Sequence, residues 1–425
     1  MNLVHSGVKV AVTGMGIVSS IGHGIEAFTE SLKQGNSGAA KLVLPALPDF
    51  PVQVGALLGE FNVDFASYEP DSGRLVSQAK KGFNRMSKSM KTTIIAAMEA
   101  WRMAELQQKE MEPGRIGIIV AGSNLTTAVL YDNVDKFRHS PEYTSPNLIL
   151  QQMDTNYVGV LSEIFGIRGE GFTVGGASAS GNMAIIQAER LIRHGYIDAC
   201  LVAGPMADLT PMELYGYFNM GALGGRSFTE NPVAASRPFD PSHEGFIYGQ
   251  ASGCLLLESR EHAEKRGVAV WAEIAGTASQ LDGNRSSDPS TDGEAQVMER
   301  CILQARKSIG EIQYINTHGT STPLGDRTEL AAIRQVFQEE TSMIWLNSTK
   351  CLTGHCLYSA GIVEAIATVQ QMVHGFLHPN INLEQPIDER FRFTGKTAEQ
   401  YQVEAALSNS FGFGGVNSSI LFTRG

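Results

Sequence analysis

The sequence of 425 residues lacks the segments that mark membrane-bound or secreted proteins. No stretch approaches the roughly 18 consecutive apolar residues of a membrane-spanning helix. The N-terminal segment, MNLVHSGVKVAV, has neither the apolar core nor the cleavage site of a signal peptide. We therefore expect a soluble, cytoplasmic protein that does not bind a membrane.

Cysteine is scarce, and its copies are scattered and odd in number: Cys200, Cys254, Cys301, Cys351 and Cys356. This distribution argues against a disulfide framework and predicts reduced thiols. Cys351 and Cys356 are the only close pair, but their spacing fits no zinc pattern and no second pair complements them. We expect no metal ion.

Basic residues are outnumbered, since 33 Lys and Arg stand against 44 Asp and Glu and give a formal net charge of −11. A chain of this charge is a poor general partner for nucleic acid, which is itself strongly negative. Small-molecule or protein-bound substrates are the better expectation.

Hydrophobic residues make up 43% of the chain, enough for a large core. Short apolar runs alternate with longer helical stretches, which is typical of an α/β protein whose strands are covered on both faces. The sequence predicts strands over residues 9–18, 116–123, 198–205, 251–259, 270–279, 312–320, 342–350 and 406–415.

Two segments echo one another. The predicted helix at 182–195, NMAIIQAERLIRHG, and the segment at 360–375, AGIVEAIATVQQMVHG, have similar apolar spacing, and each follows a glycine-containing turn. We therefore predict two related halves, residues 1–258 and 259–425, which meet at the charged stretch SREHAEKRG and pack as one body.

The stretch VGGASASGN, residues 174–182, predicts a strand, a tight turn and the start of a helix. Many enzymes present a nucleophile on such a turn, because the free N–H groups of the helix stabilise negative charge. No cysteine is present in it. Ser178 and Ser180 are the candidates, and Ser178 alone could equally be a helix cap.

Three later turns resemble site loops. YINTHGTSTPLGD presents His318, LNSTKCLTGHCLYSAG presents Lys350 and His355, and LSNSFGFGGVNSS contains glycines that let backbone N–H groups approach a ligand. Loops at strand ends form the pocket of many α/β sheets. Each residue alone has an ordinary structural explanation, but their combination indicates a site.

Five ordered motifs across nearly the whole chain resemble the β-ketoacyl synthase branch of the thiolase fold. They are KVAVTGMGIVSSIG, RPFDPSHEGFIYGQASG, NTHGTSTPLGD, STKCLTGHCLYSAG and NSFGFGGVNSS. The resemblance implies a duplicated five-layer αβαβα fold and a homodimer. It also implies a substrate carried on the phosphopantetheine of an acyl carrier protein, with no cofactor bound by this chain.

The resemblance assigns roles by position. His318 and His355 match the two catalytic histidines and Lys350 the catalytic lysine, while Asp326 and Glu364 match acids that hold this lysine. Phe413 matches the residue whose backbone N–H joins that of the nucleophile in an oxyanion hole. The family's cysteine position falls on Ser178, and Gln250 stands where the family usually has Glu.

A serine at this position has a chemical consequence. A cysteine near a helix N-terminus is partly ionised at neutral pH and can accept an acyl group, whereas a serine without an adjacent base stays protonated. Acyl loading should be lost or very slow. Decarboxylation of a malonyl thioester needs only hydrogen-bond donors for the enolate oxygen, which His318 and His355 can supply.

This pattern resembles the serine-containing ketosynthase-like decarboxylases of polyketide β-branching, which occur with an HMG-CoA-synthase-like partner in antibiotic-type pathways. It implies conversion of malonyl-acyl carrier protein to acetyl-acyl carrier protein. Two alternatives stay open: a condensing synthase that uses Ser178, and a non-catalytic subunit similar to a chain-length factor. Lys80, Lys81 and Arg85 are candidates for carrier docking, although a solvated helix face is the simpler explanation.

Overall fold

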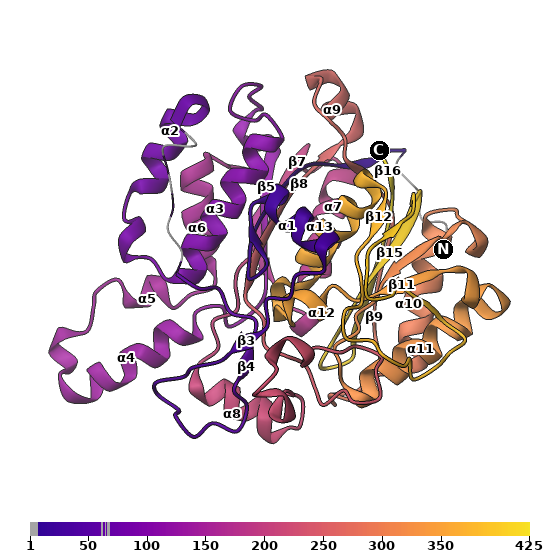
Figure 1. The fold of residues 1–425 in the computed structure, drawn as a ribbon. Coiled ribbons are helices and arrows are strands. Elements are labelled where there is room, and N and C mark those ends of the chain that lie inside the picture. Colours follow the sequence, from indigo (N-terminus) through magenta and orange to yellow (C-terminus); the bar gives the residue numbers. More distant parts are fainter. Residues whose placement is uncertain (1–6, 61–62, 64, 66–68) are drawn as a thin grey trace.

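The computed structural model describes residues 7–60, 63, 65 and 69–425. Its main sheet contains two blocks of strands (Figure 1). The first block runs β6 (Gly171–Val174), β5 (Ile116–Ala121), β7 (Ala199–Gly204), β8 (Ala251–Ser259) and β1 (Val10–Ser19). The second runs β9 (Ala272–Leu281), β16 (Val416–Arg424), β15 (Ala405–Gly412), β10 (Tyr314–Asn316), β11 (Trp345–Asn347) and β13 (Arg392–Phe393).

The two blocks share one topology. β5 pairs in parallel with β6 and β7, as β10 does with β11 and β15, while β8 and β16 complete antiparallel pairs at equivalent places. An antiparallel contact between β1 and β9 joins the blocks. The strand order of the first block is therefore repeated in the second, with β13 added at one edge.

Helices form three layers around these blocks. Between the blocks lie α7 (Ser180–Arg193) and α13 (Ala360–His374) (Figure 1). The outer face of the first block is covered by α3 (Lys88–Met103) and α6 (Thr155–Phe165), and that of the second by α10 (Thr291–Gln304) and α11 (Pro323–Phe337). Successive strand residues point to opposite layers: Val202 packs in the central core and Leu201 in the outer one. This is the predicted five-layer αβαβα arrangement.

The two central helices touch near their N-termini. A Cβ atom on Gly181 would lie 2.7 Å from the Ile362 nitrogen, and one on Gly361 would lie 2.6 Å from the Asn182 nitrogen. Only glycine allows this backbone approach. Because each helix begins at a site loop, the contact brings the Ser178 turn next to the loop that carries His355.

The remaining α-helices are α1 (Ile25–Gln34), α2 (Glu69–Lys80), α4 (Thr127–His139), α5 (Leu148–Gln151), α8 (Pro211–Asn219), α9 (Arg260–Arg266) and α12 (Lys350–Thr353). Short strands are β2 (Gly22–His23), β3 (Ala40–Lys41), β4 (Val54–Gly55), β12 (Phe376–Leu377) and β14 (Glu399–Gln400). In the part of the chain that the structure describes, no helix combines the length and apolarity needed to cross a bilayer.

The eight predicted strands overlap β1, β5, β7, β8, β9, β10, β11 and β15, although β10 and β11 are only three residues long and shorter than predicted. Among the strands of four or more residues, β6 and β16 were not predicted. β6 is only four residues long, and β16 begins inside the motif that the sequence analysis assigned to a glycine-rich loop.

Candidate active site

The turn that carries Ser178 lies between β6 and α7. Ala177 has a positive φ of 47°, an uncommon conformation for a residue with a Cβ atom. The Ser180 hydroxyl accepts a hydrogen bond from the Gly176 N–H at 2.8 Å and donates one to the Ala177 carbonyl at 2.7 Å. The two hydrogen bonds of Ser180 therefore stabilise the turn, and the Ser178 side chain faces the cavity.

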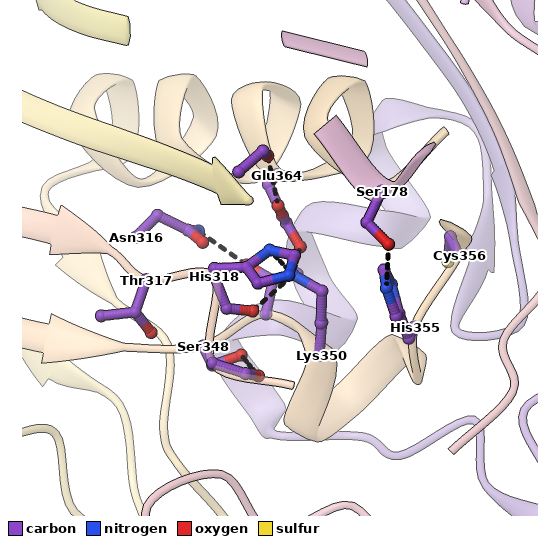
Figure 2. A network of polar contacts seen from close by, with 12 residues as sticks. Ser178, Asn316, Thr317, His318, Ser348, Lys350, His355, Cys356 and Glu364 are labelled. Atoms are coloured by element: carbon purple, nitrogen blue, oxygen red, sulfur yellow. Dashed lines mark hydrogen bonds and ion pairs between the residues drawn. The ribbon is translucent and has the colours of Figure 1, made fainter. Parts of the chain in front are cut away.

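Ser178 points at His355 (Figure 2). Its Oγ lies 2.9 Å from the His355 Nε2. On the other side of the ring, the Leu357 N–H donates to Nδ1 at 3.3 Å. An Nδ1 that accepts places the proton of a neutral imidazole on Nε2. His355 is therefore the donor toward Ser178, and it is not available as a base for the hydroxyl.

His318 is held in the same tautomer by Lys350. The Lys350 ammonium donates to the His318 carbonyl at 2.6 Å and lies 3.4 Å from its Nδ1, and it forms an ion pair with Glu364 (Figure 2). A cation beside Nδ1 leaves the proton on Nε2. Burial raises the pKa of Glu364 to about 7, and the charge of Lys350 opposes this rise.

The two imidazoles lie close together in an edge-to-face arrangement. Their ring centroids lie 5.7 Å apart at an interplanar angle of 87°. Burial, with the neighbouring Lys350 cation, holds the pKa of both rings well below the usual range. Both histidines are therefore neutral donors at physiological pH.

A cavity of about 400 Å³ opens at this point. Its apolar walls include Tyr217, Met220, Phe246, Leu357, Tyr358 and Phe411, and its polar walls include Ser178, Asp282, Glu294, His318, Thr320, Glu329 and His355. It can hold a small polar unit at the end of a longer arm.

The glycine-rich loop between β15 and β16 packs against the Ser178 turn. A Cβ atom on Gly412 would lie 2.3 Å from the Gly176 carbonyl oxygen, so only glycine fits there. Phe413 follows directly, lines the cavity and is 39% exposed. The Phe413 backbone therefore lies close to the Ser178 turn, which is compatible with the predicted oxyanion hole. The role of the Phe413 N–H in that oxyanion hole stays a prediction.

The expected role of Asp326 is wrong. Glu364 contacts Lys350 as expected, but Asp326 accepts hydrogen bonds from the Phe239 N–H at 2.7 Å and the Ser321 N–H at 3.1 Å, and lies 2.8 Å from the His243 Nδ1. Asp326 therefore ties the RPFDPSHEG segment to the loop after His318, and none of these contacts involves the lysine. The sequence motif correctly predicted that Asp326 lies near the site. It could not show which residues the Asp326 carboxylate contacts.

Gln250 stands where the family usually has Glu, and both polar atoms of its side chain have hydrogen-bond partners. Its Nε2 donates to the Tyr248 hydroxyl at 3.0 Å, and its Oε1 accepts from the Leu58 N–H at 3.1 Å. Both groups of the amide are used, so this residue has a structural role away from Ser178.

The predicted docking residues do not line the cavity. Lys80 ends α2, Lys81 follows it, and Arg85 ends the next helical turn. All three are exposed. Their role in docking stays a prediction.

Sequence reasoning missed two acids, Glu329 and Glu294. Glu329 accepts from the backbone N–H groups of His318 and Gly319, each at 2.8 Å, and so fixes the loop of the first histidine. Glu329 lies three residues after Asp326 on the same buried face of α11. Charged residues are rarely buried, so an acid at a helix position whose neighbours on that face are apolar can be recognised in the sequence as a candidate functional residue. Glu294, on α10, is also buried at the cavity wall.

Two protein-family models match the chain: the N-terminal domain of β-ketoacyl synthases over residues 8–263 and the C-terminal domain over residues 271–384. The chain belongs to the β-ketoacyl synthase family. The resemblance of the five motifs to this family is thereby confirmed.

Among curated proteins, the polyketide biosynthesis malonyl-ACP decarboxylase PksF of Bacillus subtilis is 37% identical over 97% of this chain and 95% of its own. The 3-oxoacyl-[acyl-carrier-protein] synthase 2 of Vibrio harveyi is 32% identical over 98% of both chains. This ketosynthase is thus similar to proteins with two different names, a decarboxylase and a condensing synthase.

Solved structures confirm the thiolase-like fold. A ketosynthase in complex with its type II acyl carrier protein superposes with a TM-score of 0.87 at 26% identity, covering 98% of this chain and 100% of that one. A β-ketoacyl synthase from Burkholderia phymatum gives a TM-score of 0.85, also at 26% identity and with the same coverage.

Proposed function

We propose that this ketosynthase decarboxylates malonyl-acyl carrier protein to acetyl-acyl carrier protein, as a supplier of acetyl units for polyketide β-branching. One observation carries the proposal. Ser178 occupies the nucleophile turn and receives a hydrogen bond from His355 Nε2–H, so the position has neither a thiol nor a base, while both histidine donors are kept.

The first half of a condensing reaction fails at this serine. Acyl transfer to the turn requires an ionised nucleophile, and a thiol at a helix N-terminus ionises near neutral pH. A hydroxyl needs a base that takes its proton, as in serine hydrolases. The Nε2 of His355 already has a proton and cannot take one from Ser178, and protonation of the ring at Nδ1 would create a buried cation beside Lys350.

The second half of the condensing reaction, decarboxylation of malonyl, needs only groups that this site retains. When the bond between C2 and the carboxyl carbon of malonyl breaks, its electron pair moves toward the thioester oxygen and CO₂ leaves. The Nε2–H groups of His318 and His355 converge on the cavity beside Ser178, where they can donate to that oxygen as it gains charge. Because both donors are neutral and buried, they need little reorganisation during the reaction.

The name of the Bacillus subtilis relative supports the decarboxylase, while the names of the Vibrio and other relatives support a synthase. Ser178 favours the first. A similar ketosynthase forms a complex with its acyl carrier protein, which supports a carrier as the partner here. The carrier would insert its phosphopantetheine arm into the cavity. The acetyl product would then pass to an HMG-CoA-synthase-like enzyme.

A homodimer fits the exposed apolar side chains of the projecting α4 and α5 region (Figure 1). They are Leu130, Tyr131, Val134, Phe137, Tyr143, Ile149, Leu150 and Met153. Exposed apolar side chains that gather in one region of the fold mark many protein interfaces. A partner copy of this chain would cover it.

The direct test incubates purified enzyme with malonyl-acyl carrier protein and no acyl donor, followed by intact-mass measurement of the carrier. We expect loss of CO₂ and formation of acetyl-carrier. Persistence of malonyl-carrier would exclude decarboxylation. A stable acyl adduct on Ser178 after incubation with acyl-carrier would instead establish the condensing synthase.

A further inference from the structure

A buried acid at the cavity wall has no role in the steps above. Glu294 lies in the first turn of α10, is 1% exposed and lines the same cavity as Ser178 and both histidines. Its Oε2 has no hydrogen-bond donor among the described residues. A buried carboxylate is expected to be paired or hydrogen-bonded, so this arrangement favours the protonated acid.

Two further acids face Glu294 from the neighbouring elements. Glu329 lies on α11, and Asp282 follows β9 and accepts a hydrogen bond from Asn417 of β16 at 2.7 Å. Asp282 also packs on the backbone beside Glu294, because a Cβ on Gly293 would overlap its Oδ1. Burial raises the pKa of Glu294 well above its usual range, and the charges of Glu329 and Asp282 raise it further.

The three acids differ in their hydrogen bonds. Glu329 accepts from two backbone N–H groups and lies 3.4 Å from the Asn409 amide nitrogen, and Asp282 accepts from Asn417, whereas Glu294 Oε2 has no donor. When neighbouring carboxyl groups cannot all ionise, the proton remains on the one least stabilised as an anion. Of the three acids, Glu294 is therefore the one that most strongly keeps its proton at neutral pH, although burial also raises the pKa of Glu329 to about 7.

The proposed reaction requires such a proton. After CO₂ leaves, C2 of the enolate must gain a proton to become the methyl group of acetyl. A neutral imidazole that gave up its Nε2 proton would become a strongly basic anion, so His318 and His355 are poor proton sources. The Lys350 ammonium is engaged with Glu364 and with the His318 carbonyl.

We propose that the Glu294 carboxyl group supplies this proton. The inference rests on the proposed decarboxylase function. In the step, the electron pair of the enolate forms a C–H bond at C2, the O–H bond of Glu294 breaks, and the carboxylate left behind takes a proton from solvent through the cavity. The N-terminus of α10 stabilises this transient anion.

The experiment compares wild type with Glu294→Gln, Glu294→Asp, Asp282→Asn and Asp292→Asn. The last removes an exposed acid from the same helical turn and is the matched control. Initial rates are measured on malonyl-acyl carrier protein. In parallel, the reaction is run in an equal mixture of H₂O and D₂O, and the ratio of CH₃ to CH₂D in the acetyl product is read by mass spectrometry.

We expect kcat of Glu294→Gln to fall about 10² to 10⁴-fold at unchanged KM, the range for loss of a general acid. Glu294→Asp should recover part of the rate, and Asp292→Asn should match wild type. The product isotope ratio should change only in Glu294→Gln, because water then replaces the carboxyl group as donor. This ratio depends on the proton-transfer step whichever step limits the rate.

Wild-type rate and an unchanged isotope ratio in folded Glu294→Gln would overturn the inference and leave the decarboxylase intact. A loss of activity with the wild-type isotope ratio would also overturn it, since the residue would then only maintain the cavity. If Asp282→Asn lowers kcat and Glu294→Gln does not, Asp282 would be the proton donor in place of Glu294. Failure of wild type to release CO₂ would instead reject the proposed function itself.

Discussion

Replacement of His355 by alanine tests the central claim that neutral histidine donors perform the chemistry. His355 is 3% exposed, and its Nε2–H points at Ser178 from a ring held by the Leu357 N–H. Loss of one such donor in an oxyanion-hole-type site costs about 2.7–4 kcal/mol, or roughly 10² to 10³ in rate. We expect His355→Ala to lower kcat by this factor, and His318→Ala to behave similarly.

Two companion variants separate the donor from the space it fills. Gln can place an N–H near the position of the histidine Nε2, so His355→Gln should retain more activity than His355→Ala. Ser178→Ala removes only the group that accepts this hydrogen bond and frees the donor for substrate, so we expect less than about a tenfold loss. The assay is the initial rate of acetyl-carrier formation by mass spectrometry, with a thermal melt of each variant to verify folding.

The pH dependence provides an independent measurement. Because the pKa of both rings is lowered, they stay neutral as pH falls through the usual histidine range, and neither imidazole should contribute an inflection near pH 6.5. An inflection near pH 7 that persists in His355→Ala would report Glu364 or Glu329, because burial raises the pKa of each to about 7. The reasoning is refuted if His355→Ala retains wild-type kcat, if Ser178→Ala falls as far as His355→Ala, or if an acid limb near pH 6.5 disappears in His355→Ala.

Three further predictions concern loading, docking and assembly. Ser178→Cys restores a thiol at the start of α7, so a covalent acyl adduct should form with acyl-carrier, seen by intact mass and absent in wild type. Reversal of charge at Lys80, Lys81 and Arg85 should raise KM for malonyl-carrier with kcat unchanged, and an unchanged KM would remove the docking role. Phe137→Glu, on the exposed face of α4, should shift the protein from dimer to monomer in light scattering, and a monomeric wild type would contradict the interface.

The sequence allowed prediction of the layered α/β fold because buried strands leave a strong signal. Runs such as residues 198–205 are almost wholly apolar, since alternate residues pack against helices on both faces. β6 and β16 were missed for local reasons. β6 is short and only partly buried, and β16 contains two serines in a stretch that suggests a loop until its pairing with β9 is seen.

The candidate site was predictable where a motif brings the residue to a strand end. Ser178, His318, Lys350 and His355 meet as expected, and Glu364 contacts the lysine. Asp326 was assigned the wrong partner, because the donors it meets belong to residues 239, 243 and 321 and depend on how separate loops pack. Glu294 lay outside every motif, and only the packed cavity shows that it is an acid with an unpaired oxygen.

The network also explains why the serine can coexist with an otherwise complete site. His318 is fixed by Lys350, which is fixed by Glu364, and His355 is fixed by a backbone N–H. None of these contacts involves the side chain at position 178. A thiol can therefore become a hydroxyl there without changing the orientation of either donor, because each ring is oriented from its Nδ1 side. The nucleophile and the charge-stabilising groups are structurally independent, so the loss of the first leaves the second able to act on malonyl alone.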